Sequence, residues 1–93
     1  MWEKYERHAL VRKLPKIPLE VLKRYEKWKD IVMLSGPEGL RSIKGFHDEA
    51  LKGTWAGCRS SRLGIQYRLI YTVEDKKLYV KVLDINPHDY RNK

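Results

Sequence analysis

Cysteine is almost absent from this 93-residue sequence, since Cys58 is the only one. A single thiol excludes an internal disulfide and a cysteine-rich zinc site, and it fits a reducing compartment. No apolar run approaches the roughly 20 residues of a membrane span. The start, Met1 to Arg7, also lacks the apolar core of a signal peptide. We therefore expect a cytoplasmic protein with no membrane partner, folded as one domain over residues 1–93.

Acidic side chains are the minority charge, and none lies between Ala50 and Val73. The whole chain has 20 Lys and Arg against 12 Asp and Glu, a formal net charge of +8. Such an excess favours contact with a polyanion, above all a nucleic acid. The guanidinium group of arginine can donate hydrogen bonds to phosphate oxygens. Aromatic rings can stack on nucleic-acid bases, although such rings are also common in the hydrophobic core. The acid-free segment holds both kinds of residue, namely Lys52, Arg59, Arg62, Arg68, Trp55, Tyr67 and Tyr71.

Residue clusters for metal or nucleotide chemistry are missing too. Asp48 and Glu49 adjoin His47, but no second group of ligands stands at a recognisable spacing. The sequence has no glycine-rich phosphate loop and no spacing typical of a Ser, Cys and His nucleophilic site. We expect neither a metal nor a small-molecule cofactor.

The first half of the chain has helical periodicity. Residues 2–14 have apolar side chains on one helical face and end at Pro15, so they predict a first helix. Pro18 suits the first position of a second helix. A short helical turn over residues 38–41 could follow Ser35-Gly36-Pro37. The apolar stripe of the second helix consists of Val21, Tyr25, Trp28 and Val32.

The second half has the pattern of three strands, over residues 54–62, 67–73 and 78–85. The connections between them are short, which predicts an antiparallel meander. Pro87 cannot continue a central strand, so the chain leaves the sheet there. The predicted fold class is α+β: an N-terminal helical hairpin packed on one face of a small antiparallel β-sheet. The other face would stay open for a ligand.

Two histidines fall where an active site could form. His47 precedes the predicted sheet and His88 follows it, and a meander can bring both points to one edge. Cleaving RNA without a metal needs a base for the 2′-OH proton, cations for the phosphorane oxygens and an acid for the departing 5′-oxygen. Histidine suits both proton roles, since its usual pKa lies near neutrality. Spacing alone favours the alternative that both are ordinary surface histidines.

Three segments resemble the RelE/ParE toxin superfamily. Residues 51–59 (Leu-Lys-Gly-Thr-Trp-Ala-Gly-Cys-Arg) resemble its Leu-x-Gly-x-Trp approach to the sheet, and residues 67–71 (Tyr-Arg-Leu-Ile-Tyr) resemble its central strand. Residues 87–91 (Pro-His-Asp-Tyr-Arg) look like the C-terminal segment of its ribonuclease members. The resemblance extends from about Gly45 to Arg91, and the YafQ-like and HigB-like ribonucleases are nearest.

This resemblance implies the toxin of a bacterial type II toxin–antitoxin pair, a RelE-type mRNA interferase. It implies a metal-independent endoribonuclease that cuts mRNA on the 70S ribosome and is inhibited by a cognate acidic antitoxin. It also implies that Arg68 stabilises the transition-state phosphate, that His88 is the general acid and that Tyr90 stacks on the substrate base. The general base is His47 or its rival Glu49. We further assign RNA contacts to Lys44, Lys52, Arg59 and Arg91.

The sequence departs from the family pattern in places. YafQ-like members carry a histidine near the end of the first predicted strand, where this chain has Arg62, which favours phosphate binding there. Most members open with a β-strand, whereas residues 2–14 have a helical pattern, which leaves the presence of that strand open. Arg59 and Arg62 are three apart and cannot share a face of a regular strand without a bulge. Two other functions remain open: a ParE-like toxin that poisons gyrase, and an RNA-binding module without catalysis.

Overall fold

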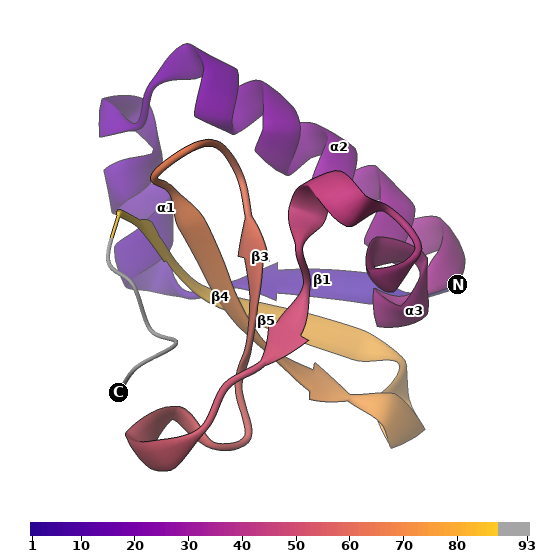
Figure 1. Cartoon of the computed structure of the whole chain (residues 1–93). Helices are drawn as coiled ribbons and strands as arrows, with labels where there is room; N and C mark the ends of the chain where they lie inside the picture. The colour runs from indigo at the N-terminus through magenta and orange to yellow at the C-terminus, as the bar shows by residue number, and fades with distance from the viewer. Residues whose placement is uncertain (88–93) are drawn as a thin grey trace.

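The computed structural model of the chain describes residues 1–87. That part of the chain contains eight helices and strands and several short 3₁₀ turns. They are, in order, β1 (Glu3–Glu6), α1 (His8–Lys13), α2 (Leu19–Ser35), α3 (Pro37–Arg41), β2 (Glu49–Ala50), β3 (Arg59–Arg62), β4 (Arg68–Glu74) and β5 (Tyr79–Asn86), with the 3₁₀ turn Leu14–Lys16 between α1 and α2. The strands form one sheet in the order β1-β5-β4-β3-β2, with α2 running across one side of it (Figure 1). This arrangement confirms the predicted α+β class.

The predicted meander and second helix are confirmed. Strands β3, β4 and β5 pair antiparallel through short connections, and β5 ends one residue before Pro87. Helix α2 follows Pro18, and Gly36 ends it with a φ of 71°. Gly36 is needed there for a second reason, since a Cβ on it would lie 2.6 Å from the Trp2 indole nitrogen. The predicted stripe of α2 is the part of the helix that the sheet buries: Val21, Tyr25, Trp28 and Val32.

The prediction of a helix over residues 2–14 is wrong at its start. Residues Glu3–Glu6 form β1, which pairs parallel with β5, and the helix begins only at His8. Tyr5 packs edge-on against Tyr79 of the neighbouring strand at 5.0 Å between ring centroids. On the other side of β1, Glu6 accepts a hydrogen bond from the hydroxyl of Tyr25. These long-range contacts outweigh the local helical pattern, and they make the sheet mixed instead of wholly antiparallel.

The first predicted strand is also shorter than residues 54–62. Gly53 and Gly57 have φ values of 66° and 94°, in the left-handed region that interrupts a strand, so only residues 59–62 pair with β4. A backbone hydrogen bond from Leu51 to Cys58 closes the intervening loop. Before that loop, β2 adds a two-residue edge strand that the sequence did not predict.

The register divides the sheet into two faces. Leu69, Tyr71 and Val73 of β4 pack in the main core beneath the helices, so the alternate residues Arg68, Ile70 and Thr72 belong to the opposite face. We call this opposite face the open face. It is open only in part, because Ile70 and Leu51 form a small second core with the 51–58 loop.

Candidate active site

The open face brings two predicted site residues directly opposite each other. Arg62 of β3 pairs with Arg68 of β4 in the antiparallel register, and Asn86 of β5 completes the row. Two arginines at directly opposite positions of neighbouring strands can both donate to one anion, so the arrangement suits an anionic ligand. The two guanidinium groups present planar, fork-shaped sets of N–H donors that match phosphate oxygens. Arg68 is largely buried, with 7% of its surface exposed.

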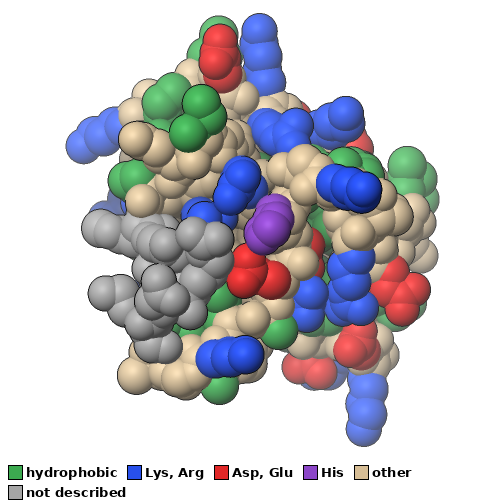
Figure 2. Space-filling view, in the orientation of Figure 1, with side chains coloured by type: hydrophobic (Ala, Val, Ile, Leu, Met, Phe, Trp, Pro, Cys, Tyr) green, Lys and Arg blue, Asp and Glu red, His purple; other side chains and the backbone are tan. Residues whose placement is uncertain are grey.

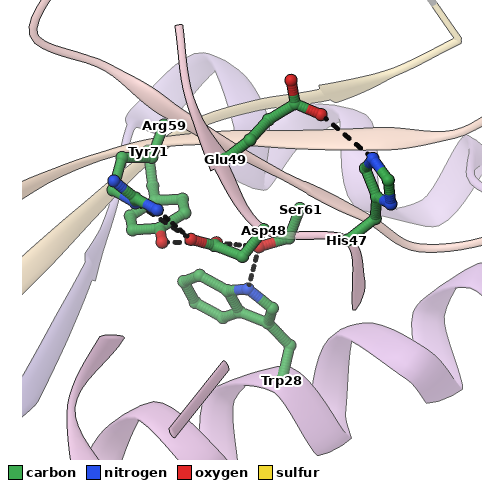
Figure 3. Close-up of polar contacts among 7 residues, drawn as sticks. All are labelled: Trp28, His47, Asp48, Glu49, Arg59, Ser61 and Tyr71. Atoms are coloured by element: carbon green, nitrogen blue, oxygen red, sulfur yellow. Dashed lines mark hydrogen bonds and ion pairs between the residues drawn. The ribbon is translucent and has the colours of Figure 1, made fainter. Parts of the chain in front are cut away.

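The two candidate bases lie together beside this arginine pair. Glu49 of β2 is opposite Ser60 of β3, which places it on the open face. His47 has a left-handed backbone, with φ of 45°, and its Nε2 lies 3.4 Å from Oε2 of Glu49 (Figure 3). The contact is an ion pair only when the imidazole is protonated. The imidazole is half-exposed, whereas the carboxylate is more enclosed.

Buried polar atoms without a hydrogen bond gather on the same face. Within residues 1–87 there are three: Oε2 of Glu49, Oγ of Ser60 and Nε of Arg62. Folded proteins pair nearly all such atoms, so a group of exceptions calls for an explanation. All three belong to the open face by register, which marks this face as the candidate active site.

Arg59 lies on the other face from Arg62, as their spacing requires. It is opposite Tyr71, a core residue, and its Nε and Nη2 donate to Oδ1 of Asp48 at 2.9 and 2.7 Å. Burial lowers the pKa of Arg59, but the hydrogen bond and charge of Asp48 outweigh it and raise the pKa. The assignment of Arg59 to RNA binding stays a prediction, but this geometry gives the side chain a partner within the protein.

Asp48 is the residue that sequence reasoning missed. Its side chain is fully buried, and its second oxygen, Oδ2, accepts hydrogen bonds from Ser61 at 2.7 Å and Tyr71 at 2.5 Å. Ser61 in turn accepts a hydrogen bond from the Trp28 indole at 2.9 Å (Figure 3). Burial, followed by the charge and hydrogen bond of Asp48, raises the pKa of Tyr71 far above its usual value. The sequence places Asp48 between two candidate bases, but its partners come from distant elements that only the fold brings near.

The remaining predicted site residues either lie in exposed loops next to β2 or fall outside the described part of the chain. Lys44 and Lys52 are exposed in turns on either side of β2. Lys44 also lines a cavity of about 280 Å³ with Arg41 and His47. Lys and Arg side chains surround a histidine and acidic side chains on the surface in Figure 2. The other predicted site residues lie outside the described residues: His88, Tyr90 and Arg91.

Two further features of residues 1–87 bear on the predictions from sequence. No helix in this part is long and apolar enough to cross a membrane. The described side chains include no group of three or more His, Cys, Asp and Glu residues arranged to hold a metal ion.

Comparison with known proteins gives structural relatives only. No protein-family model and no curated protein matches the chain. A chain of the archaeal RelE–RelB complex from Pyrococcus horikoshii OT3 is 28% identical, with 92% of this chain and 93% of that chain covered and a TM-score of 0.72. A mutant of YafQ from E. coli is 14% identical, with 95% and 94% covered and a TM-score of 0.73. A chain of the YoeB–YefM complex from Staphylococcus aureus is 17% identical, with 96% and 99% covered and a TM-score of 0.70.

These likenesses extend over nearly the whole length of each chain, including the N-terminal half, for which the sequence motifs gave no residue-level match. The chain therefore has the fold of the RelE/ParE toxin superfamily.

Proposed function

We propose that this chain is the toxin of a type II toxin–antitoxin pair and that it cleaves mRNA on the ribosome without a metal ion. The observation that carries the proposal is the direct pairing of Arg62 with Arg68 on the face that also holds Glu49. Cations that face a bound phosphate, beside a carboxylate able to accept a proton, are what RNA cleavage by the 2′-hydroxyl requires. The RelE-like fold supports the same conclusion.

The proposed reaction begins at the carboxylate. Glu49 accepts the 2′-OH proton, and the 2′-oxygen attacks the adjacent phosphorus. Arg62 and Arg68 donate hydrogen bonds to the phosphorane oxygens, where negative charge grows in the transition state. The bond from phosphorus to the 5′-oxygen then breaks, and a protonated His88 supplies the proton to that oxygen. The products are a 2′,3′-cyclic phosphate and a 5′-hydroxyl end.

Glu49 is preferred to His47 as the base for a structural reason. Its carboxylate belongs to the face of the arginine pair and is the more enclosed of the two groups, whereas the imidazole of His47 is half-exposed. His47 would then adjust the charge and position of the carboxylate. Tyr90 is proposed to stack on the substrate base, and Lys44, Lys52 and Arg91 to bind the RNA backbone.

Two partners follow from this function. The 70S ribosome would present the mRNA, which sets the site of action in the cytoplasm. A cognate acidic antitoxin would cover part of the basic site, including Arg62, Arg68 and His88. Two of the similar structures are complexes, RelE–RelB and YoeB–YefM, and antitoxin segments of this kind can dock as a helix or as an added strand.

The test is a cleavage assay with purified protein, translating ribosomes and a defined mRNA, followed by mapping of the new 5′ ends. We expect discrete cuts, and we expect Arg68→Ala to reduce their rate by about 10²–10³-fold. Lys27→Ala, at an exposed position on α2, is the control and should cleave normally. A folded protein that leaves mRNA intact but inhibits supercoiling by gyrase would instead be ParE-like. One that binds RNA without either effect would be the non-catalytic module.

A further inference from the structure

The buried carboxylate of Asp48 needs an explanation beyond stability. It accepts four hydrogen bonds, from Arg59 twice, Ser61 and Tyr71, and none of its surface is exposed. Removing two charges from water costs several kcal/mol per ion, and a well-packed apolar group is often as stabilising as a buried ion pair. The carboxylate instead fixes the position of its chain segment, because hydrogen bonds hold both of its oxygens.

The segment that carries Asp48 has little else to hold it. Strand β2 is two residues long and lies at the edge of the sheet, where within residues 1–87 it pairs only with β3. The 3₁₀ turn before it ends at His47, whose left-handed backbone is a strained conformation for a residue with a side chain. Such a conformation persists only where neighbouring contacts enforce it. The side chain of Asp48 joins this segment to β3 and β4, through hydrogen bonds with Arg59 and Tyr71.

The geometry also fixes where the neighbours of Asp48 point. Successive side chains of an extended segment alternate between faces. Asp48 is directed toward α2 and the core, so Glu49 is directed to the open face, where it meets the imidazole of His47 (Figure 3). A rotation of this segment would move both candidate proton-transfer groups at once.

We propose that Asp48 is a positioning residue, which holds His47 and Glu49 at the open face through its hydrogen bonds to Arg59, Ser61 and Tyr71. This inference rests on the proposed function for its effect on cleavage, but the placement of the two side chains can be tested without it. Arg59 then serves the site by anchoring Asp48 and not by binding RNA.

The first variant is Asp48→Asn, which keeps the shape but replaces one acceptor oxygen with an NH₂ group. An amide cannot accept from Ser61 and Tyr71 and also from Arg59, so the segment loses its anchor on one side. Misplacement of a reacting group by about 1 Å can cost about 10²-fold in rate, and we expect a loss of about 10–100-fold in single-turnover cleavage. Ribosome binding should be unchanged. Asp30→Asn, at an exposed position on α2, is the matched control and should be as active as the unmodified chain.

A double-mutant cycle separates positioning from general damage. If Asp48 acts through the base, Asp48→Asn should reduce the cleavage rate little further in a chain that already carries Glu49→Gln, because the effects of coupled residues are not additive. Full additivity of the two losses would overturn the proposal. Tyr71→Phe removes one hydrogen bond to Asp48 with little change of shape, so it can replace Asp48→Asn in the cycle if that variant folds poorly. Its coupling energy with Glu49→Gln should have the same sign and be smaller.

A second readout needs no activity. In NMR spectra of the unmodified chain we expect a nuclear Overhauser contact between the His47 ring and the Glu49 side chain, and we expect Asp48→Asn to lose it while core resonances persist. Retention of that contact in the variant would overturn the positioning role, whether or not the protein cleaves RNA. Loss of the contact in a protein whose unmodified form never cleaves mRNA would support positioning and reject the proposed function.

Discussion

Replacing Arg62 with methionine should make the protein more stable and less active. Methionine keeps most of the length of the side chain but removes the charge and the Nε atom. In the structure that charge lies directly opposite Arg68, and Nε is buried without a hydrogen bond. Both features oppose folding and both disappear in the variant.

The expected size of the gain follows from these two terms. A like-charge pair directly opposite in a sheet costs about 0.2–1 kcal/mol, and an unsatisfied buried donor costs about 1–3 kcal/mol. The variant also loses some packing of the arginine stem, so we expect a net gain of about 1 kcal/mol. For a domain of this size that gain corresponds to a rise in Tm of about 4–8 °C. Under the proposed function Arg62 donates to the transition-state phosphate, so cleavage should fall about 10²–10³-fold.

The assay is thermal and urea unfolding of both proteins at low and high salt, together with single-turnover cleavage. Salt screens a largely buried pair only weakly, so the charge part of the gain should shrink slightly in 1 M salt, and the part due to the unsatisfied donor should remain. Lys27→Met removes one positive charge at an exposed position on α2 and controls for the general repulsion of a chain with a net charge of +8. A variant of Arg62 that unfolds more easily than the unmodified chain would refute the reasoning, and so would one that is stabilised but fully active.

Three other outcomes are expected. Glu49→Gln should lower cleavage by about 10²–10⁴-fold and His47→Ala by less than about tenfold, and the reverse order would make His47 the base. Cys58 should react with iodoacetamide more slowly in the folded protein than after unfolding, since burial raises the pKa of its thiol; equal rates would contradict this. Burial alone would raise the pKa of Asp84, but its hydrogen bonds, above all from Lys13, lower it below 3.8 overall. The stabilising effect of Asp84 should therefore be present above about pH 4 and be lost as the pH falls further, so urea unfolding should show a deficit for Asp84→Asn at pH 7 that shrinks as the pH is lowered below about 4.

The prediction of the fold from sequence succeeded where the periodic pattern of apolar residues is long, and it failed where that pattern is short. Helix α2 has four apolar residues at helical spacing, all buried against the sheet, so the local signal and the tertiary contacts agree. Strand β1 has only four residues, and its partner β5 lies at the other end of the chain. No local periodicity can reveal such a pairing. Strand β2 is shorter still, and it exists because the neighbouring β3 offers a free edge.

The candidate site was predictable in its residue types but not in its arrangement. Arginine residues on the predicted strands, with one histidine before the sheet and one after it, indicated RNA chemistry. That Arg62 faces Arg68 while Arg59 faces away depends on the strand register, which spacing alone does not give. Asp48 escaped notice because its partners lie 11, 13 and 23 residues along the chain. The sequence shows each of them as an ordinary polar or aromatic residue.

The four residues of β3 show why register matters so much in this site. The strand reads Arg-Ser-Ser-Arg, so Arg59 and Ser61 point to the helices, and Ser60 and Arg62 point to the open face. The inward pair bonds to Asp48, and the outward arginine completes the site for an anion. A shift of one residue would exchange the two faces, leaving the buried carboxylate without its hydrogen bonds and bringing Arg59 to the ligand. Because an unpaired buried carboxylate costs far more than a surface contact provides, the Asp48 cluster also enforces the register that sets Arg62 opposite Arg68.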